Sequence, residues 1–328
     1  MGTTLLIFAV TQLFNPVARA SLYITNIQQF TTENINQVIE KHGLNDPAYM
    51  QFFRWLSEVL SGNLGYSRTA RQPVLQALIT RIPATFELVM FSAPIIILLG
   101  IYLGVKSAVH RDKPIDHATR TLSIIGWSLP TFWLGIILLS VFYVGFQAFP
   151  PRRLSPTTYN FVSMSGSYVK YTGLYTIDGL LNGQLWITLE ALEHLVLPVL
   201  TLTIVIVTII IRVMRSSMLE ALNKGYIIAA RAKGLTQNEV INKHARRNAL
   251  IPTVTISGLL VAGLLNGVVI TETIFSLNGI GMWAAAAALQ MDIAGVLGFT
   301  LFSGFLFVMA NLIVDILYAY LDPRIMLA

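Results

Sequence analysis

The sequence has no cysteine and few charged residues. Without cysteine, disulfide bridges, thiol catalysis and cysteine-ligated zinc or iron–sulfur sites are excluded. Charged residues make up 12% of the 328 residues, whereas a soluble domain carries roughly 25%. Charge this sparse cannot cover a soluble surface, and 55% of the residues are hydrophobic. Because the apolar residues gather in long runs, lipid is the expected solvent for much of the chain.

Signatures of catalysis are also missing. The sequence contains no G-x-x-x-x-G-K-[ST] phosphate loop, so any ATP that drives this protein must be hydrolysed by another polypeptide. No Ser/His/Asp order or nucleophile elbow appears, and no cluster of histidine or methionine favours a metal. The formal net charge of +6 does not indicate nucleic acid, because much of the Lys and Arg sits in two segments between apolar runs. We therefore expect neither catalysis nor a bound cofactor or metal in this chain.

Five apolar segments are long enough to cross a hydrocarbon core, which needs about 20 helical residues. They are Phe86–Val105, Leu122–Phe149, Leu195–Val213, Leu250–Phe275 and Val296–Tyr320. Thr3–Phe14 is apolar but measures only roughly 18 Å at the helical rise. A signal peptide is the competing interpretation, but the segment lacks a basic region before it and a small-residue cleavage site. We interpret residues 1–14 as a first membrane helix, truncated at its start, which makes six spans.

The distribution of Lys and Arg predicts the orientation. Residues 106–120 and 212–247 are rich in basic side chains and should face the cytoplasm, whereas residues 276–295 have none and should lie outside. Six spans then place both termini in the cytoplasm. The predicted organisation is a first helix at 1–14, an extracytoplasmic loop region at 15–85 and a transmembrane domain at 86–328, with a cytoplasmic loop at 214–249.

Two regions outside the membrane are long. In the first, Asp46 and Pro47 precede an amphipathic pattern that predicts a surface helix with one packing face. That face comprises Tyr49, Phe52, Phe53, Leu56, Val59 and Leu60. The second region, residues 150–192, is rich in Tyr, Thr, Ser and Gly and is expected to form an irregular loop.

The most informative segment runs from Tyr226 to Pro252, where the fifth span begins. Its pattern predicts two short helices around a hinge at Gly234, which can end the first helix in a left-handed conformation. Thr236 and Glu239 form a capping box for the second helix. The first helix carries three small residues that would permit close approach of another surface: Ala229, Ala230 and Ala232. The alternative interpretation is a basic loop that only fixes topology.

The order and spacing of this segment resemble the EAA loop of ABC importer permeases of the dipeptide, oligopeptide and nickel class. The matching residues are Tyr226, Ala230, Arg231, Ala232, Lys233, Gly234, Leu235, His244, Arg247, Asn248, Leu250 and Pro252. Ile228 departs from the general motif, because it stands where the name-giving glutamate is expected. Apolar docking would replace an acidic contact at that position. The likeness extends over nearly the whole chain, including residues 272–281 and the tail at 311–324.

The resemblance implies an all-α integral membrane protein of the type I ABC importer permease fold in a prokaryotic cytoplasmic membrane. It also implies a second homologous permease subunit, two cytoplasmic ATPase subunits that hold ATP and magnesium, and an extracytoplasmic solute-binding protein. The loop at 226–244 would then be a coupling helix that docks on the ATPase. The resemblance assigns this docking to Tyr226, Ala229, Ala230, Arg231, Ala232, Lys233, Gly234 and Leu235, with support from His244, Arg247, Asn248 and Pro252.

Two questions stay open at this point. An ion-gradient-driven secondary transporter is the alternative function, but the sequence shows no convincing pair of charges at the membrane midplane. The cargo of the resembling class is a dipeptide, an oligopeptide, nickel or an oligosaccharide, and the sequence does not choose among them.

Isolated ionisable residues in or beside the spans receive structural interpretations. Glu272 and Asp315 could line a pore, but a hydrogen bond to a neighbouring helix or proximity to water is favoured, because each lies near a predicted membrane boundary. Glu190 and His194 are interpreted as an i, i+4 pair rather than a metal site. Two arginines at the end of the fourth span, Arg212 and Arg215, are expected to reach the lipid headgroups.

Overall fold

The computed structural model describes residues 5, 8–9, 11–20, 22–24 and 31–321. Within this part of the chain the regular structure is helical, apart from one antiparallel pair of two-residue strands. Four described helices are long and apolar enough to cross a membrane, and a strongly bent pair would make a fifth span. The four are α5 (Val74–Val109), α10 (Leu185–Leu222), the helical run Gln237–Leu265 and α16 (Ile293–Leu321). The predicted all-α membrane fold is confirmed.

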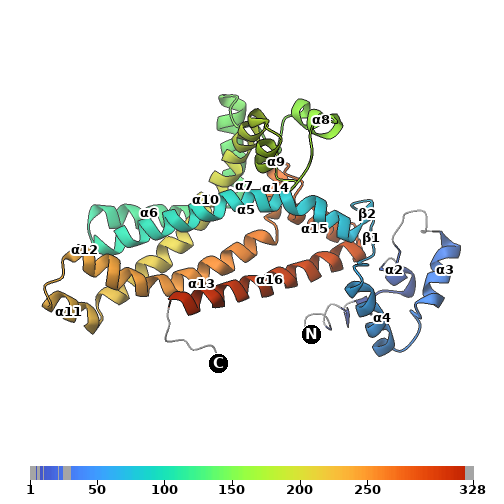
Figure 1. Ribbon diagram of the computed structural model, residues 1–328, viewed down its shortest axis with the longest axis horizontal. Coiled ribbons are helices and arrows are strands. Elements are labelled where there is room, and N and C mark those ends of the chain that lie inside the picture. The colour runs from blue at the N-terminus through green and yellow to red at the C-terminus, as the bar shows by residue number, and fades with distance from the viewer. Residues whose placement is uncertain (1–4, 6–7, 10, 21, 25–30, 322–328) are drawn as a thin grey trace.

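The bundle is held together most closely by α5 and α10, which pack along much of their length (Figure 1). Two glycines on α5 make this approach possible. A β-carbon at Gly100 would lie 2.5 Å from Ile210 Cγ2, and one at Gly104 would lie 2.7 Å from Met214 Cβ. Small residues serve this purpose in membranes, where helices associate by close packing rather than by exclusion of water.

The predicted third span, Leu122–Phe149, is not one straight helix. It consists of α6 (Pro114–Ser128), α7 (Thr131–Leu138) and the π-helical segment η2 (Leu139–Gly145), and the axis bends by 98° at the break. Leu129 is extended at ψ 122° because it precedes Pro130, whose ring disfavours the helical conformation for the residue before it. Pro130 therefore breaks the predicted span into two helices.

The predicted fifth span, Leu250–Phe275, is also interrupted. Helix α13 (Arg246–Leu265) ends before Gly267, which adopts φ +96°, and α14 (Val269–Ile274) follows. A β-carbon at Gly267 would lie 2.4 Å from the Cα atom of Gly281, so both the left-handed backbone and the close approach require glycine. Helix α15 (Ile280–Leu289) then leads to α16.

The two carboxylates predicted within spans have different surroundings. Glu272 is fully buried, where it accepts hydrogen bonds from Thr85 Oγ1 at 2.7 Å and from the backbone N–H of Met282 at 2.7 Å. The predicted hydrogen bond to a neighbouring helix is therefore confirmed for Glu272. Asp315 lies exposed on α16.

At one end of the bundle, called the α3 end, the described residues between Pro16 and Pro73 form a small helical module (Figure 1). It contains α2 (Pro16–Ala20), α3 (Thr32–Lys41), α4 (Ala48–Leu60), β1 (Tyr66–Ser67) and β2 (Gln72–Pro73).

The predicted surface helix is α4, but its packing face is centred on Trp55, which is 4% exposed, and Tyr49 and Phe53 are exposed. Phe8 packs on Trp55 with ring centroids 5.7 Å apart. The predicted helix at 3–14 lies partly outside the described residues, so the count of six spans stays a prediction.

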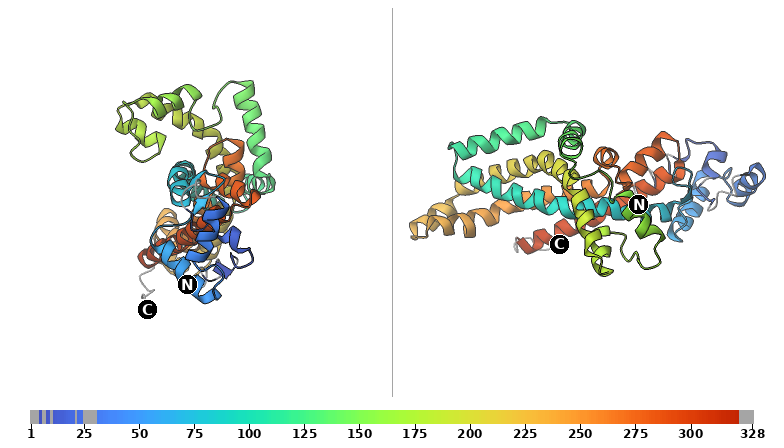
Figure 2. Two further views of the ribbon diagram at one scale, coloured as in Figure 1. Left: turned by 90° about the vertical axis from the view of Figure 1, so that its right-hand side faces the viewer. Right: turned by 90° about the horizontal axis from the view of Figure 1, so that it is seen from above.

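Residues 150–192 are more regular than predicted. They contain α8 (Pro156–Met164), α9 (Tyr175–Leu181) and the start of α10, and these helices stand out to one side of the bundle (Figure 2). Hydrogen bonds of polar side chains organise the segment, which composition alone does not reveal. Glu190 accepts from Ser155 N–H at 2.7 Å and from Thr158 Oγ1 at 2.6 Å. Its Oε1 lies 3.9 Å from His194 Nε2, so the predicted i, i+4 pair is present.

Candidate functional site

The segment singled out in the sequence lies at the opposite end of the molecule, called the α11 end (Figure 1). After α10 ends at Leu222, a short turn leads into α11 (Gly225–Ala232). Ile227 and Ala230 on the inner face of α11 are 0% and 6% exposed. They belong to an apolar cluster with Met214 and Met218 of α10 and Ala249 of α13. Helix α11 is therefore packed onto two of the long helices by its own side chains.

The outer face of α11 combines apolar, small and basic side chains. Ile228 is 65% exposed and Tyr226 is 41% exposed, although both are large and apolar. The other exposed residues of this surface are Ala229, Arg231, Ala232 and Lys233. Of the three predicted small residues, Ala230 therefore packs inside the chain, and only Ala229 and Ala232 can meet another surface.

Helix α11 ends in a Schellman motif, as the position of Gly234 predicts. Gly234 has φ +79°; its N–H donates to Arg231 O at 3.0 Å, and the N–H of Leu235 donates to Ala230 O at 3.4 Å. Nothing lies within 4 Å of a β-carbon built at Gly234, so the requirement for glycine is conformational rather than steric.

The helix that follows begins with the predicted capping box. Thr236 Oγ1 accepts from Glu239 N–H, while the Glu239 carboxylate accepts from the N–H of Thr236. From α12 (Gln237–Glu239) the chain continues through the π-helical segment η3 (Val240–Ala245) into α13. One helical path thus leads from the turn at Gly234 into a membrane-spanning helix.

The residues predicted to support this loop are only partly brought together. Tyr226, Asn248 and Pro252 line one pocket of about 260 Å³, and Asn248 Nδ2 donates to His244 O at 2.9 Å. Arg247 instead lines a separate pocket with Lys243 and Arg246. Pro252 lies within α13 rather than at the start of a span, because the helix already begins at Arg246.

A buried ion pair behind α11 was missed by sequence reasoning. Arg215 of α10 donates to both carboxylate oxygens of Asp116 at 2.7 and 2.8 Å, and Ser107 of α5 also donates to Asp116. Asp116 is fully buried, so the expectation that Arg215 reaches the headgroups is wrong. Arg212 stacks on Trp127 with its guanidinium 4.9 Å from the ring centroid. The available signal was an aspartate in the first turn of α6, in a segment rich in basic residues.

Comparison with known proteins identifies the family. Residues 96–327 match the family described as "Binding-protein-dependent transport system inner membrane component". The chain belongs to this family. It is 40% identical over 298 residues to the probable D,D-dipeptide transport system permease protein of Escherichia coli (strain K12), a match that covers 89% of this chain and 84% of the relative.

Two other similar proteins come from bacteria other than Escherichia coli. The permease is 36% identical over 326 residues to the di/tripeptide transport system permease protein of Pseudomonas aeruginosa (strain UCBPP-PA14), covering 99% of this chain and 94% of the relative. It is 36% identical over 290 residues to the oligopeptide transport system permease protein of Bacillus subtilis (strain 168), covering 88% and 84%.

Membership settles the class of protein. The chain is the permease subunit of an ABC importer, a non-catalytic component that passes several times through the inner membrane. The resemblance drawn from the sequence is confirmed, and the alternative of an ion-gradient-driven secondary transporter is not supported. Among the described residues, no group of three or more His, Asp or Glu side chains is arranged to hold a metal ion.

Proposed function

We propose that this permease forms a translocation path for short peptides and is coupled to a separate ATPase through residues 226–244. The observation that carries the proposal is the construction of α11. Its inner face is buried in the cluster that joins α10 and α13, while its outer face is exposed. A push on the outer face would reach two membrane-spanning helices through packed side chains and through the continuous helix that follows Gly234. Helix α11 is thus suited to act as a lever.

The outer face of α11 has the chemistry of a docking surface. A large apolar side chain, Ile228, is exposed between small residues, which is the composition of an interface core. Arg231 and Lys233 stand at its edge and would pair with acidic groups of the partner. The missing glutamate of the general motif is thereby replaced by apolar burial at Ile228.

The proposed assembly contains two homologous permease subunits, two ATPase subunits and an extracytoplasmic solute-binding protein. The basic residues around α11 favour a cytoplasmic location for this end, which with six spans places both termini in the cytoplasm. Closure of the ATPases around ATP and magnesium would move α11 and switch the path between inward-open and outward-open states. Peptides are the proposed cargo because the named relatives are peptide transport permeases.

The substitution Gly234→Val tests the lever. A β-branched residue at φ +79° costs about 1–2 kcal/mol, so the Schellman turn should open and α11 should lose its fixed position. In proteoliposomes that contain the complete importer and its loaded binding protein, we expect ATP hydrolysis to continue while peptide uptake per ATP falls several-fold.

Gly225→Ala is the matched control. Gly225 opens α11 with a right-handed backbone, and nothing lies within 4 Å of a β-carbon there, so uptake per ATP should stay unchanged. Equal peptide uptake per ATP in the Gly234→Val and Gly225→Ala importers would contradict the proposal that α11 acts as a lever. A purified native complex that contains no nucleotide-binding subunit would refute the proposed assembly itself.

A further inference from the structure

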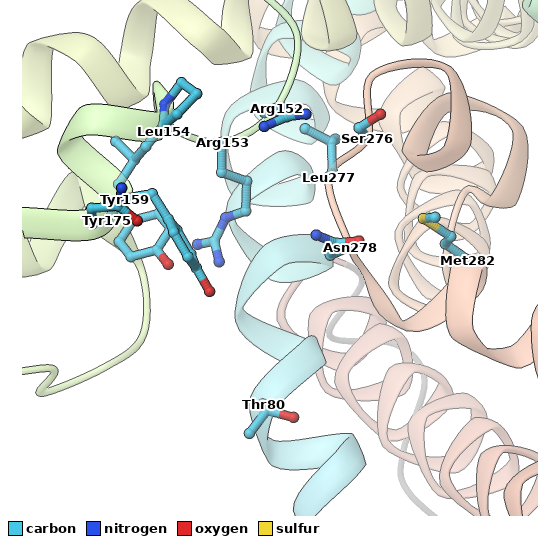
Figure 3. A pocket seen from close by; sticks show the side chains of 12 residues that line it. Thr80, Arg152, Arg153, Leu154, Tyr159, Tyr175, Ser276, Leu277, Asn278 and Met282 are labelled. Atoms are coloured by element: carbon cyan, nitrogen blue, oxygen red, sulfur yellow. The ribbon is translucent and has the colours of Figure 1, made fainter. Parts of the chain in front are cut away.

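A large cavity lies toward the α3 end, between α5, α8 and the segment that joins α14 to α15 (Figure 3). Its volume is about 630 Å³, within the range of roughly 300–1,000 Å³ that is typical of small-molecule sites. The lining residues that matter here are Arg152, Arg153, Asn160, Tyr175, Ser276 and Asn278. The lining has two arginines and no acidic side chain. Because Arg153 pairs with Glu87 behind the lining, Arg152 supplies the net positive charge that can attract an anion.

Arg153 is fixed in place beneath this cavity. Its Nε and Nη2 atoms donate to Glu87 Oε2 at 3.1 and 2.6 Å, and Nη2 also donates to Gly173 O at 2.9 Å. The guanidinium lies 4.2 Å from the ring centroid of Tyr175. Glu87 is 1% exposed and also accepts from the N–H and hydroxyl of Thr176, both at 2.8 Å. Nη1 makes none of these hydrogen bonds, and in Figure 3 the guanidinium lies beside the tyrosine side chains, across a gap from Asn278.

Arg152 has a fixed backbone and a free side chain. Its N–H donates to Phe275 O at 2.7 Å, and its carbonyl oxygen lies 3.1 Å from His194 Nδ1. These contacts hold a non-glycine residue at φ +78°, a conformation that surrounding structure must stabilise. The side chain is exposed and has no ion pair among the described residues. The fold therefore positions a guanidinium at the cavity without neutralising it.

We propose that this cavity receives the C-terminal carboxylate of a short peptide as the peptide leaves the solute-binding protein. The inference rests on the proposed peptide-transport function. Arg152 binds the carboxylate through the planar fork of donors that matches two oxygens. Asn160, Ser276 and Asn278 supply donors and acceptors for the peptide backbone. The positive charge of Arg152 repels a metal cation, and a neutral oligosaccharide gains nothing from that charge.

The test measures transport at saturation with the complete importer in proteoliposomes. The probes are L-alanyl-L-alanine and its C-terminal amide, each loaded on excess binding protein. For Arg152→Gln we expect the saturated uptake rate of the dipeptide acid to fall about tenfold, the worth of one charge-assisted hydrogen bond. Uptake of the amide should change less than twofold. Arg152→Lys should restore part of the rate, because it keeps the charge but not the fork of donors.

Lys170→Gln is the matched control, because it removes an exposed positive charge from the same loop region without touching the cavity. It should leave both rates unchanged. An unchanged saturated rate for Arg152→Gln would overturn the proposal. A change confined to the concentration of binding protein at half-maximal rate would also overturn it, because Arg152 would then contact the binding protein. If the unsubstituted importer shows no ATP-dependent uptake of the dipeptide, the proposed function fails instead.

Discussion

The α11 end and the cavity near the α3 end of this permease are built differently. Residues 226–244 at the α11 end, the proposed coupling segment, are called the handle. The handle is one continuous stretch of chain, in which Gly234 ends one helix and Thr236 caps the next. The cavity is assembled from three distant segments that contain Thr80, Arg152 and Asn278. The first can be recognised from spacing along the chain, whereas the second exists only after long helices have packed.

The backbone shows the same contrast. The left-handed residue in the handle is Gly234, for which this conformation carries little penalty. Around the cavity, left-handed positions are occupied by residues with a β-carbon, including Arg152 at φ +78°, Ser276 at +52° and Asn278 at +53°. Such positions persist only where neighbours enforce them, and functional sites are where they gather. The handle is therefore a local structure, and the cavity is a tertiary one.

The strongest test of this contrast neutralises the carboxylate behind the handle. Asp116→Asn leaves Arg215 without its bidentate partner, and loss of one member of a buried pair costs about 3–5 kcal/mol. We expect the unfolding temperature of the purified importer, followed by intrinsic fluorescence, to fall by several degrees and coupling to weaken. Asp112→Asn is the control, since that exposed side chain pairs only with neighbouring Arg111. Equal unfolding temperatures would show that the Asp116–Arg215 ion pair does not stabilise the helix packing next to the handle.

The equivalent change near the cavity should have a smaller effect on stability and a more selective effect on function. In Glu87→Gln the new amide oxygen still accepts from Thr176, and Arg153 keeps Gly173 O, so the cost is about 1–3 kcal/mol. We expect dipeptide uptake to fall while the ATPase subunits still co-purify in full amount. Loss of the ATPase subunits from this variant would contradict the separation of roles, in which the cavity affects uptake and the α11 end binds the ATPase.

The smallest expected effect lies in the local structure of the handle. Thr236→Ala removes the capping oxygen at a cost of about 1 kcal/mol. Amide hydrogens of residues 237–245 should exchange faster, while those around Arg152 keep their protection. Asn238→Ala is the control, because its side chain bonds only to that of Asn242. Faster exchange at both ends of the molecule would indicate that the handle is not a local unit.

The correct predictions concern local structure, and the wrong ones concern features that depend on tertiary packing. The left-handed helix end at Gly234 and the capping box at Thr236 were predicted correctly, because their hydrogen bonds join residues three to five positions apart. The two interrupted spans were predicted as continuous, because hydropathy does not say whether Pro130 bends a helix or ends it. Arg215 was assigned to the headgroups because nothing in the local pattern connects it to Asp116, 99 positions away.

The sequence by itself determined the solvent, the helical class and the handle. Long apolar runs require helices that satisfy their own backbone hydrogen bonds in lipid, and the handle is specified by turn chemistry within one short segment. Only the tertiary structure decided where charges are paired and where they stay free. Asp116 neutralises Arg215 and Glu87 neutralises Arg153, whereas Arg152 remains available. The reason is physical: whether a charge is neutralised depends on which groups lie within a few ångströms, and packing rather than local sequence sets those distances.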